Sequence, residues 1–573
     1  MSVLGAFKLP TLSNEPFTIY GPGSTEREEL SKVVDGLRNR EAQKVQPFIN
    51  GEYVKGGTVE KQASPYDHKH ILVEYEQADA KLVGEAIQGA LAAKRKWVQT
   101  PLHERAAIFY RAAWLIQNDY KYEMMAATML GQGKNPYQAD IDCVAESIDF
   151  LKTFPSIAEQ LYHNQPPFNA AGVWNRSEQR PLDGFVYAVS PFNFTALAVN
   201  LVLAPIIVGN VVIWKPSPGA MLSSWLFNKI MIEAGLPAGV LQFVPGDAEQ
   251  VTDAVLSSRD FGALHFTGST QVFQSLWTKI GAKIGFWTSY PRLIGETSGK
   301  NFHLIHKSAN VRNAALKTIR AAFEYQGQKC SACSRVYVAR SIADEFLSIL
   351  ASETKKLTMG DKITDFSGPV ISKPAFDRVS GYITEAKQDS SVEIVEGGDF
   401  DDSVGYYIVS LSLTCLCGRL SLTFAIQRPT VLKVTSPNSK FLKQEIFGPV
   451  VAVHIYEDDS FGKDLFQLID TTSEFALSGA IFANDRNAIT ETTEGLRFSA
   501  GNFYIKYVNL EVALTTHVNK LTRFSDQCTD AMPGHQPFGG SRASGLLQRF
   551  ISSRTIKENF GTIDDVLYCS NLK

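Results

Sequence analysis

A cysteine that follows a lysine on a glycine-punctuated loop is the residue of this sequence best suited to covalent chemistry. Cys330 lies in the stretch Gln326-Gly327-Gln328-Lys329-Cys330. The thiolate is the reactive form of cysteine, and a nearby cation lowers the thiol pKa from its usual value of about 8.5. Cys330 is therefore a candidate nucleophile, although a cysteine considered alone is more often a buried structural residue.

Two further residues have the chemistry that such a nucleophile needs. Glu296 precedes the turn Thr297-Ser298-Gly299, which is a suitable position for a general base whose pKa its surroundings tune. Asn193 carries an amide donor that could stabilise an oxyanion. A loop asparagine is more often a simple turn residue, and so this assignment requires that the three residues meet in the fold.

A basic residue and a glycine turn are the candidates for holding a ribose or a phosphate. Lys215 ends an apolar run, where it can either reach such a ligand or simply be solvated. The turn Thr267-Gly268-Ser269 follows another apolar run and opens a helical pattern, so its backbone N–H groups could face a phosphate. The dinucleotide fingerprint GxGxxG does not occur in the sequence, and residues 295–300 lack the spacing of a P-loop.

Alternating strand and helix patterns position these residues. The strand patterns lie at 184–190, 210–216, 240–244 and 263–266, and the helical patterns between them lie at 196–207, 223–234 and 250–257. This alternation predicts a parallel sheet with crossover helices, which binds ligands at the carboxyl ends of its strands. Ser190, Lys215 and Gly268 fall at those ends.

A second alternation begins near Arg292 and contains the Cys330 loop, so we place a domain boundary close to Gly295. A helical pattern at 309–323 leads into that loop. Earlier in the chain, the patterns predict a charged helix at 25–40, a hairpin at 48–54 around Asn50-Gly51, and packed amphipathic helices at 79–163.

Composition argues against several classes of protein. A net charge of −3 over 573 residues provides no basic surface for nucleic acid. Seven scattered cysteines indicate a reducing compartment, and the pairs Cys330/Cys333 and Cys415/Cys417 are too far apart to predict a metal site. No segment reads as a membrane span, and residues 1–27 resemble neither a secretory signal nor an Arg-rich transit peptide.

Six motifs occur in the order, and at the approximate spacings, of the aldehyde dehydrogenase superfamily, which the sequence resembles over residues 45–560. They are Asn193, Lys215, Gly268-Ser269, Glu296, Cys330 and Glu445-Ile446-Phe447-Gly448-Pro449. Four longer strings, at 190–196, 299–303, 323–335 and 536–545, resemble in particular the branch of the family that oxidises glutamate semialdehyde. General members usually have tryptophan at the position of Phe192.

The resemblance implies an α/β fold of two parallel-sheet domains, a Rossmann-like cofactor domain and a catalytic domain, with a bridging β-hairpin that serves oligomerisation. We expect an N-terminal extension at 1–45, an NAD-binding domain at 46–295, a catalytic domain at 296–505, and an anchor loop with a C-terminal arm at 506–573. The hairpin is expected around 170–188, where 172–176 would pair with 185–187. A homodimer or larger homo-oligomer in the mitochondrial matrix is implied as well.

The resemblance also implies roles for single residues. Cys330 would attack the aldehyde of glutamate semialdehyde, Asn193 would hold the oxyanion, and Glu296 would activate water to release glutamate, with NAD as the oxidant. The implied NAD contacts are Ser190, Lys215, Gly268, Ser269, Thr270, Gln271, Val272, Glu445 and Phe447. The implied substrate contacts are Ser331 and Ala531 at the amino-acid end, and Phe194 and Phe538 along the aliphatic part. No metal is implied. Pro218 stands where many NAD-specific relatives have glutamate, which leaves NADP open on charge.

The sequence departs from the family at three places. Segments 409–427 and 506–525 interrupt runs that are continuous in relatives, and Leu546 follows Gly545 where relatives have a polar loop. We interpret the two segments as translated introns, a hypothesis that cDNA sequencing tests. The second adjoins the substrate anchor, where a misplacement of ~1 Å can cost about 100-fold in rate. Two alternatives stay open: an enzyme for another small semialdehyde, and an inactive protein with a disrupted anchor loop.

Overall fold

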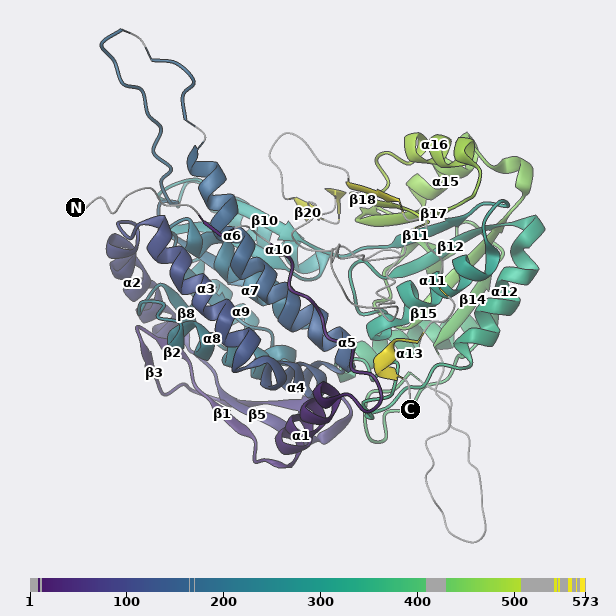
Figure 1. Cartoon of the computed structure of the whole chain (residues 1–573), viewed down its shortest axis with the longest axis horizontal. Coiled ribbons are helices and arrows are strands. Elements are labelled where there is room, and N and C mark those ends of the chain that lie inside the picture. The colour runs from purple at the N-terminus through teal and green to yellow at the C-terminus, as the bar shows by residue number, and fades with distance from the viewer. Residues whose placement is uncertain are drawn as a thin grey trace.

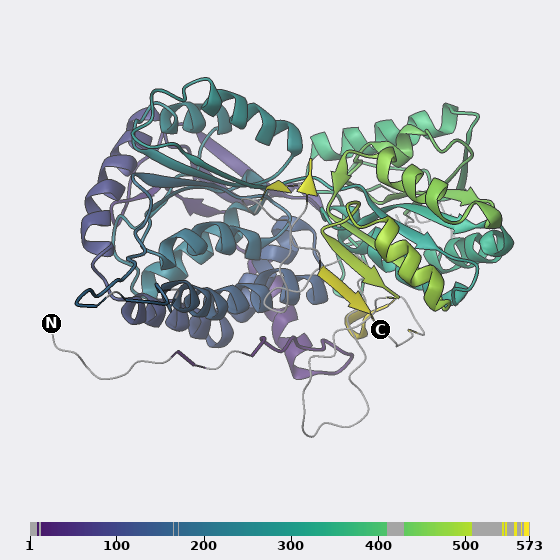
Figure 2. The same cartoon turned by 90° about the horizontal axis from the view of Figure 1, so that it is seen from above.

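The computed structural model describes residues 9–10, 13–163, 165–169, 171–408, 429–506, 541–543, 545–546, 555–558, 563 and 567–571. Figure 1 shows two lobes, of which the purple-to-teal lobe comes from the first half of the chain and the green lobe from the second half. Each lobe is built on an eight-stranded sheet. In the view from above, helices lie on both sides of the sheet in the first lobe (Figure 2).

The first sheet is parallel in its centre and antiparallel at its edges. Its order is β20-β10-β9-β6-β7-β8-β2-β3. The strands are β2 (Phe48–Ile49), β3 (Glu52–Tyr53), β6 (Phe185–Val189), β7 (Val212–Lys215), β8 (Leu241–Phe243), β9 (Phe261–Thr267), β10 (Arg292–Glu296) and β20 (Gly545–Leu546). Pairing of β2 with β3 across Asn50-Gly51 confirms the predicted hairpin, and the strands and helices predicted between 184 and 268 are confirmed as well.

Helices of the first lobe cover this sheet and build its outer layer. They are α1 (Thr25–Asn39), α2 (Ala80–Trp97), α3 (Leu102–Asn118), α4 (Lys121–Gln132), α5 (Pro136–Ala139), α6 (Glu146–His163), α7 (Thr195–Ile207), α8 (Met221–Glu233), α9 (Ala248–Val255) and α10 (Thr270–Gly281). A π-helix, Asp140–Ala145, joins α5 to α6. A small sheet of order β1-β5-β4 is formed by Gln43–Val45, Asp67–Glu76 and Val59–Ser64.

Burial on both faces explains why the central strands read as continuous apolar runs. In β6, Val186 and Ala188 belong to one hydrophobic core, whereas Phe185 and Tyr187 belong to another on the opposite face. A strand covered by helices on both sides has no solvent-facing positions, so its sequence loses the polar alternation of a half-exposed strand. The helices thereby fix the sheet, and the sheet fixes the loops at its carboxyl edge.

The second sheet carries the cysteine loop. Its order is β13-β14-β15-β12-β11-β17-β18-β21. The strands are β11 (Asn301–Ile305), β12 (Cys333–Ala339), β13 (Val392–Glu396), β14 (Thr430–Val434), β15 (Val450–Tyr456), β17 (Ser478–Phe482), β18 (Asn502–Ile505) and β21 (Thr555–Glu558). All pair in parallel except β13 with β14. Two further short strands, β16 (Phe475–Ala476) and β19 (Ser541–Arg542), pair with each other.

Helices of the second lobe are α11 (Val311–Phe323), α12 (Arg340–Thr354), α13 (Lys373–Gln388), α14 (Lys440–Lys443), α15 (Lys463–Thr472) and α16 (Arg486–Gly495). The helix expected at 309–323 is thus confirmed as α11. Among the helices that the structure describes in either lobe, none combines the length and the apolar composition that a membrane crossing requires.

The predicted pairing of residues 172–176 with 185–187 is wrong. Residues 185–189 form β6, which already has parallel partners on both sides, β7 and β9, and so no edge is left for an antiparallel partner. The chain after α6 instead forms an exposed loop that projects from the first lobe (Figure 1). Within it, Gln165 and Ser177 are joined by two hydrogen bonds of 2.9 and 3.0 Å.

Candidate active site

A cleft of about 890 Å³ opens between the strand ends of the first lobe and the cysteine loop of the second. This volume lies in the upper part of the range for small-molecule and cofactor pockets, roughly 300–1,000 Å³. The rings of Phe192, from the loop after β6, and Phe447, from the second lobe, meet edge to face at 6.0 Å. Both line the cleft, so its wall is shared between the lobes.

Cys330 reaches the cleft from a turn of unusual backbone conformation. After α11 the chain makes a short 3-10 helix, Glu324–Gly327, in which Tyr325, Gln326 and Gly327 have φ of 49°, 55° and 65°. At Gly327 a Cβ atom would meet the carbonyl oxygen of Gly448, so only glycine fits. Residues other than glycine are strained in the left-handed backbone conformation, and such strained residues concentrate at functional sites. The half-buried Cys330 follows three residues later and lines the cleft.

Asn193 is held against the cysteine loop. Its side-chain amide donates a hydrogen bond of 3.0 Å to the backbone carbonyl of Gln328. The side chain is buried, and Asn193 and Cys330 both line the cleft. The structure therefore brings together an amide donor and a thiol that are separated by 137 residues of sequence.

Glu296 stands at the last position of β10, at the carboxyl edge of the first sheet. Its backbone is in register with Thr267 of β9 and with Gly545 of β20. Its carbonyl also accepts a hydrogen bond of 3.2 Å from the N–H of Gly268. The next two residues, Thr297 and Ser298, line the cleft. The turn proposed to carry a base and the turn proposed to carry a phosphate are thus joined by their backbones.

Most of the predicted cofactor residues line this one cleft. Those that do are Ser190, Gly268, Ser269, Gln271, Val272, Glu445 and Phe447, whereas Lys215 and Thr270 are buried behind it. The hydroxyl of Ser269 caps α10 by accepting from the N–H of Val272 at 3.3 Å. The positive end of this helix therefore opens beside the cleft, as an anion site requires.

Lys215 is buried at the end of β7. Its ammonium donates to the carbonyl of Pro216 at 3.4 Å. Burial lowers its pKa to about 8, while the charge of Asp247 acts in the opposite direction. A lysine whose charge is this weakly compensated suits a site that a polar ligand completes.

Glu445 is fixed beside the Glu296 turn. Its carboxylate accepts a hydrogen bond of 2.9 Å from the N–H of Gly299. Burial raises the pKa of Glu445, and the Gly299 N–H, Ser298, Lys300 and Arg378 lower it. Lys300 is itself buried, and burial lowers its pKa to about 7. The sequence assigned no role of its own to Lys300, which lies in the turn at 295–300 and in the string at 299–303.

The predicted substrate residues are placed in part. Ser331 is buried, and its carbonyl accepts from the hydroxyl of Ser478 at 3.3 Å. Phe194 precedes α7, and its ring lies 4.3 Å from the ammonium of Lys134 and 5.3 Å from that of Lys329. Ala531 and Phe538 lie outside the described residues, as do the two segments interpreted as insertions, except for Lys506.

A buried row of alternating charges, which no sequence pattern predicted, supports the cysteine loop. Lys134 pairs with Asp142, Asp142 also lies 3.4 Å from Lys329, and Lys329 lies 2.8 Å from Glu324. The hydroxyl of Tyr568 donates a hydrogen bond to the carboxylate of Glu324, which links this row of charges to the C-terminal segment. Lys134 and Lys329 are far apart in sequence, and so no local spacing could reveal this arrangement.

These ion pairs also involve the cation next to Cys330. The ammonium of Lys329 lies against the carboxylates of Glu324 and Asp142, which offset part of its charge. That Lys329 lowers the pKa of the Cys330 thiol stays a prediction. The other member of the CxxC pair, Cys333, is buried, and burial raises its pKa to about 12, as expected for a packing residue.

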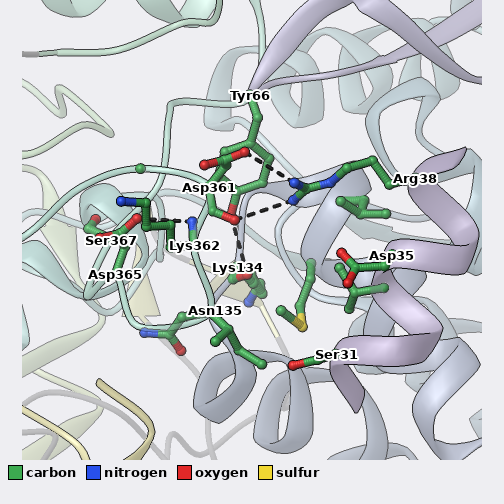
Figure 3. A pocket seen from close by; sticks show the side chains of 15 residues that line it. Ser31, Asp35, Arg38, Tyr66, Lys134, Asn135, Asp361, Lys362, Asp365 and Ser367 are labelled. Carbon is green, nitrogen blue, oxygen red and sulfur yellow. Dashed lines mark hydrogen bonds and ion pairs between the residues drawn. The ribbon is translucent and has the colours of Figure 1, made fainter. Parts of the chain in front are cut away.

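A second, smaller cavity of about 270 Å³ lies between α1, the end of α4 and residues 360–367 (Figure 3). Arg38 and Asp361 form an ion pair at 3.2 Å across it. The carboxylate of Asp365 accepts from the N–H of Lys362 at 3.0 Å. Because its cations and acids face one another, this cavity offers little net charge with which to orient a ligand. Within the described residues, no group of three or more His, Cys, Asp or Glu side chains is arranged to hold a metal.

The fold and the cleft define a class, and the chain belongs to the aldehyde dehydrogenase family, whose pattern matches residues 53–520. Two relatives within the family are named for the same enzymatic activity. The chain is 44% identical over 586 aligned residues to the probable delta-1-pyrroline-5-carboxylate dehydrogenase of Schizosaccharomyces pombe, covering 100% of both chains. It is 38% identical over 569 residues to the mitochondrial delta-1-pyrroline-5-carboxylate dehydrogenase of Homo sapiens, covering 97% of this chain and 94% of the human protein.

Solved structures give the same match. The crystal structure of the delta-pyrroline-5-carboxylate dehydrogenase from Mycobacterium tuberculosis bound with NAD superimposes with a TM-score of 0.85. The two sequences are 38% identical, and the match covers 96% of this chain and 94% of that one. The two-lobed α/β architecture is therefore that of the aldehyde dehydrogenases.

Proposed function

We propose that this chain is an NAD-dependent dehydrogenase that oxidises glutamate γ-semialdehyde, the open form of 1-pyrroline-5-carboxylate, to glutamate in proline breakdown. The observation that carries the proposal is the meeting of Cys330, Asn193 and the Glu296 turn at a single cleft shared by both lobes. The names of the relatives support the choice of substrate.

The residues of the cleft fit NAD. The Ser269-capped start of α10 suits the pyrophosphate, and the carboxylate of Glu445, held by Gly299, suits the hydroxyls of a ribose. Ser190, Gln271, Val272 and Phe447 would complete the contacts, with Lys215 and Thr270 behind them. When bound, NAD supplies the acceptor for a hydride.

We infer the following reaction for the protein's own groups. The Cys330 thiolate adds to the aldehyde carbon, and the side-chain amide of Asn193 with the Cys330 N–H holds the oxygen as it becomes negative. After oxidation the substrate is bound to Cys330 as a thioester. Glu296 takes a proton from water as the water attacks that thioester, and the thiolate of Cys330 leaves. Ser331 and Phe194, together with Ala531 and Phe538, would recognise the amino-acid end and the aliphatic chain.

We further propose a homo-oligomer in the mitochondrial matrix. The projecting loop at 165–181 supports oligomerisation, because Phe168 and Trp174 are 82% and 76% exposed there. Large exposed aromatic side chains of this kind usually mark a contact surface. The name of the human relative supports the location.

One assay tests the proposal. Purified protein is incubated with 1-pyrroline-5-carboxylate and NAD, and NADH formation is followed beside the Cys330→Ala variant and beside other small semialdehydes. We expect turnover that Cys330→Ala abolishes. Turnover with an unrelated semialdehyde alone would refute the substrate. Binding of NAD without any turnover would favour an inactive protein whose anchor loop is disrupted.

A further inference from the structure

A short segment near the C-terminus contacts both lobes within six residues. Strand β19 pairs with β16 of the second lobe, where Phe475 faces Arg542 and Ala476 faces Ser541. Strand β20, which begins three residues after Arg542, pairs with Gly295 and Glu296 of the first sheet. Figure 1 places β20 between the two lobes. We call the described residues of this segment, 541–543 and 545–546, the strap.

The middle of the strap provides one carbonyl for two hydroxyls. The carbonyl of Ala543 accepts from the hydroxyl of Thr297 at 2.6 Å and from that of Thr270 at 3.1 Å. A carbonyl oxygen has two lone pairs, so both bonds can form at once. Both threonines are buried, and a buried hydroxyl that loses its acceptor is destabilising. Thr297 follows Glu296 directly, and Thr270 is the first residue of α10.

The second lobe anchors the strap through an ion pair. The guanidinium of Arg542 donates to the carboxylate of Asp470 at 2.7 Å and to the backbone carbonyl of the same residue at 2.9 Å. The hydroxyl of Ser499 donates to that carboxylate at 2.6 Å and fixes its orientation. Arg542 has a φ of 57°, a left-handed conformation that turns the chain from β19 towards β20.

These contacts matter because the thiol and the base come from different lobes. Cys330 belongs to the second lobe, and Glu296 ends a strand of the first sheet. Their separation therefore depends on how the lobes are tied together. The strap pairs with Glu296 itself, bonds to the residue after it, and bonds to the start of the helix that faces the cofactor cleft.

We propose that the strap sets the register between the two lobes, with Arg542, Thr297 and Thr270 as positioning residues for the base turn and for the cofactor helix. The proposal builds on the proposed function, because it takes the roles of Glu296 and α10 from there. The two hydrogen bonds of the Ala543 carbonyl then affect different steps. The bond from Thr297 governs hydrolysis of the thioester, and the bond from Thr270 governs binding of NAD.

Single substitutions separate the two bonds. Thr297→Val and Thr270→Val keep the shape of the side chain and remove the hydroxyl donor, whereas Arg542→Gln removes the anchor. Thr278→Val is the matched control, because Thr278 lies on the same helix as Thr270 and its exposed hydroxyl bonds only locally, to the carbonyl of Gln274 at 2.9 Å. Arg340→Gln is the control for the anchor, because Arg340 pairs with Glu457 at 3.0 Å on the surface.

Two quantities are measured for each variant. The dissociation constant of NAD is measured without substrate, and the pre-steady-state burst of NADH is compared with the steady rate. We expect Thr270→Val to raise the dissociation constant about tenfold, the size expected for a lost buried hydrogen bond. We expect Thr297→Val to leave that constant within twofold of the wild type and to slow the steady rate about tenfold after a normal burst. Arg542→Gln should change both quantities.

Hydrogen exchange at the amides of Gly295 and Glu296 gives a readout that needs no turnover. We expect faster exchange in Arg542→Gln and Thr297→Val than in the two controls, and an intermediate rate in Arg542→Lys, which keeps the charge but loses the two-pronged contact. If all strap variants match the controls in exchange, in NAD binding and in burst, the proposal is wrong. If the wild type binds NAD but oxidises no semialdehyde, the proposed function fails, while exchange and NAD binding still decide the strap.

Discussion

Removing one charge from the buried chain behind Cys330 tests how the nucleophile loop is held. Lys134, Asp142, Lys329 and Glu324 are each at most 4% exposed. Lys329→Met keeps the apolar stem but removes the cation between the carboxylates of Glu324 and Asp142. Loss of one partner of a buried pair costs ~3–5 kcal/mol, because it leaves a charge uncompensated. Asp142 keeps Lys134 as a partner, so we expect the lower end, about 3 kcal/mol.

The assay is urea denaturation, run together with the rate at which iodoacetamide alkylates Cys330. A second substitution, Glu324→Gln, neutralises the acid that Lys329→Met leaves behind, and so the double variant should recover part of the lost free energy of unfolding. Lys356→Met is the matched control. Lys356 pairs with Glu353 at 2.7 Å, but its side chain is 64% exposed, and such a pair contributes ~0–1 kcal/mol.

Two results are expected if the buried ion pairs hold the loop. Lys329→Met must cost clearly more than Lys356→Met, and adding Glu324→Gln must restore stability rather than reduce it further. We also expect a changed alkylation rate, since Lys329 precedes the nucleophile directly. Equal losses in the two lysine variants would show that the alternating charges do not hold the loop.

Four further predictions concern the residues of the cleft and those beside it. Asn193→Ala should lower kcat by about 10²–10³ with little change in KM, which single-turnover kinetics can check, and an effect under fivefold would remove Asn193 from the oxyanion site. Because the pKa of Lys215 is lowered to about 8 in the folded protein, its charge is lost as pH rises through 8; we expect the KM for NAD to rise there, and Lys215→Arg to abolish the rise. The burial penalty of Lys215 is fully present below pH 8 and is relieved as pH rises towards its usual pKa of 10.5, so its contribution to stability should increase with pH in that window. Gly327→Ala should lower both thermal stability and activity, because φ is 65° and the new Cβ would meet the carbonyl of Gly448, whereas Gly381→Ala, on open space, should do neither.

The sheet and its ligand edge could be predicted because the relevant signals are local. A strand buried on both faces is an apolar run, and a polar or glycine residue at its end marks the carboxyl edge. Ser190, Lys215 and Gly268 were placed in this way. In the structure Ser190 and Gly268 directly follow β6 and β9, and Lys215 is the last residue of β7. The preference of crossover connections for neighbouring parallel strands accounts for β6-β7-β8 and for β9-β10. It does not predict that β9 pairs with β6 instead of β8.

What escaped prediction depends on pairings between distant segments. Residues 172–176 were paired in the prediction with 185–187, which already have two partner strands in the sheet. Of the two carboxylates that pair with Lys329, that of Asp142 lies far away in the sequence, so no local spacing predicted this contact. The two strands of the strap leave no strand pattern in the sequence, because each of them has only two residues.

The contacts of the strap also bear on the second of the two segments interpreted as translated introns. Residues 506–525 raised the question of whether the chain still completes the cleft. On the near side, Lys506 follows β18, and its carbonyl accepts from the ammonium of Lys317 at 2.8 Å. On the far side the chain pairs with β16 and β10, and later with β18 through β21. Because the free energy of loop closure grows only slowly with length, added residues between two fixed ends cost the fold little. Their effect on activity then depends on the substrate anchor that follows them, and not on the register of the lobes.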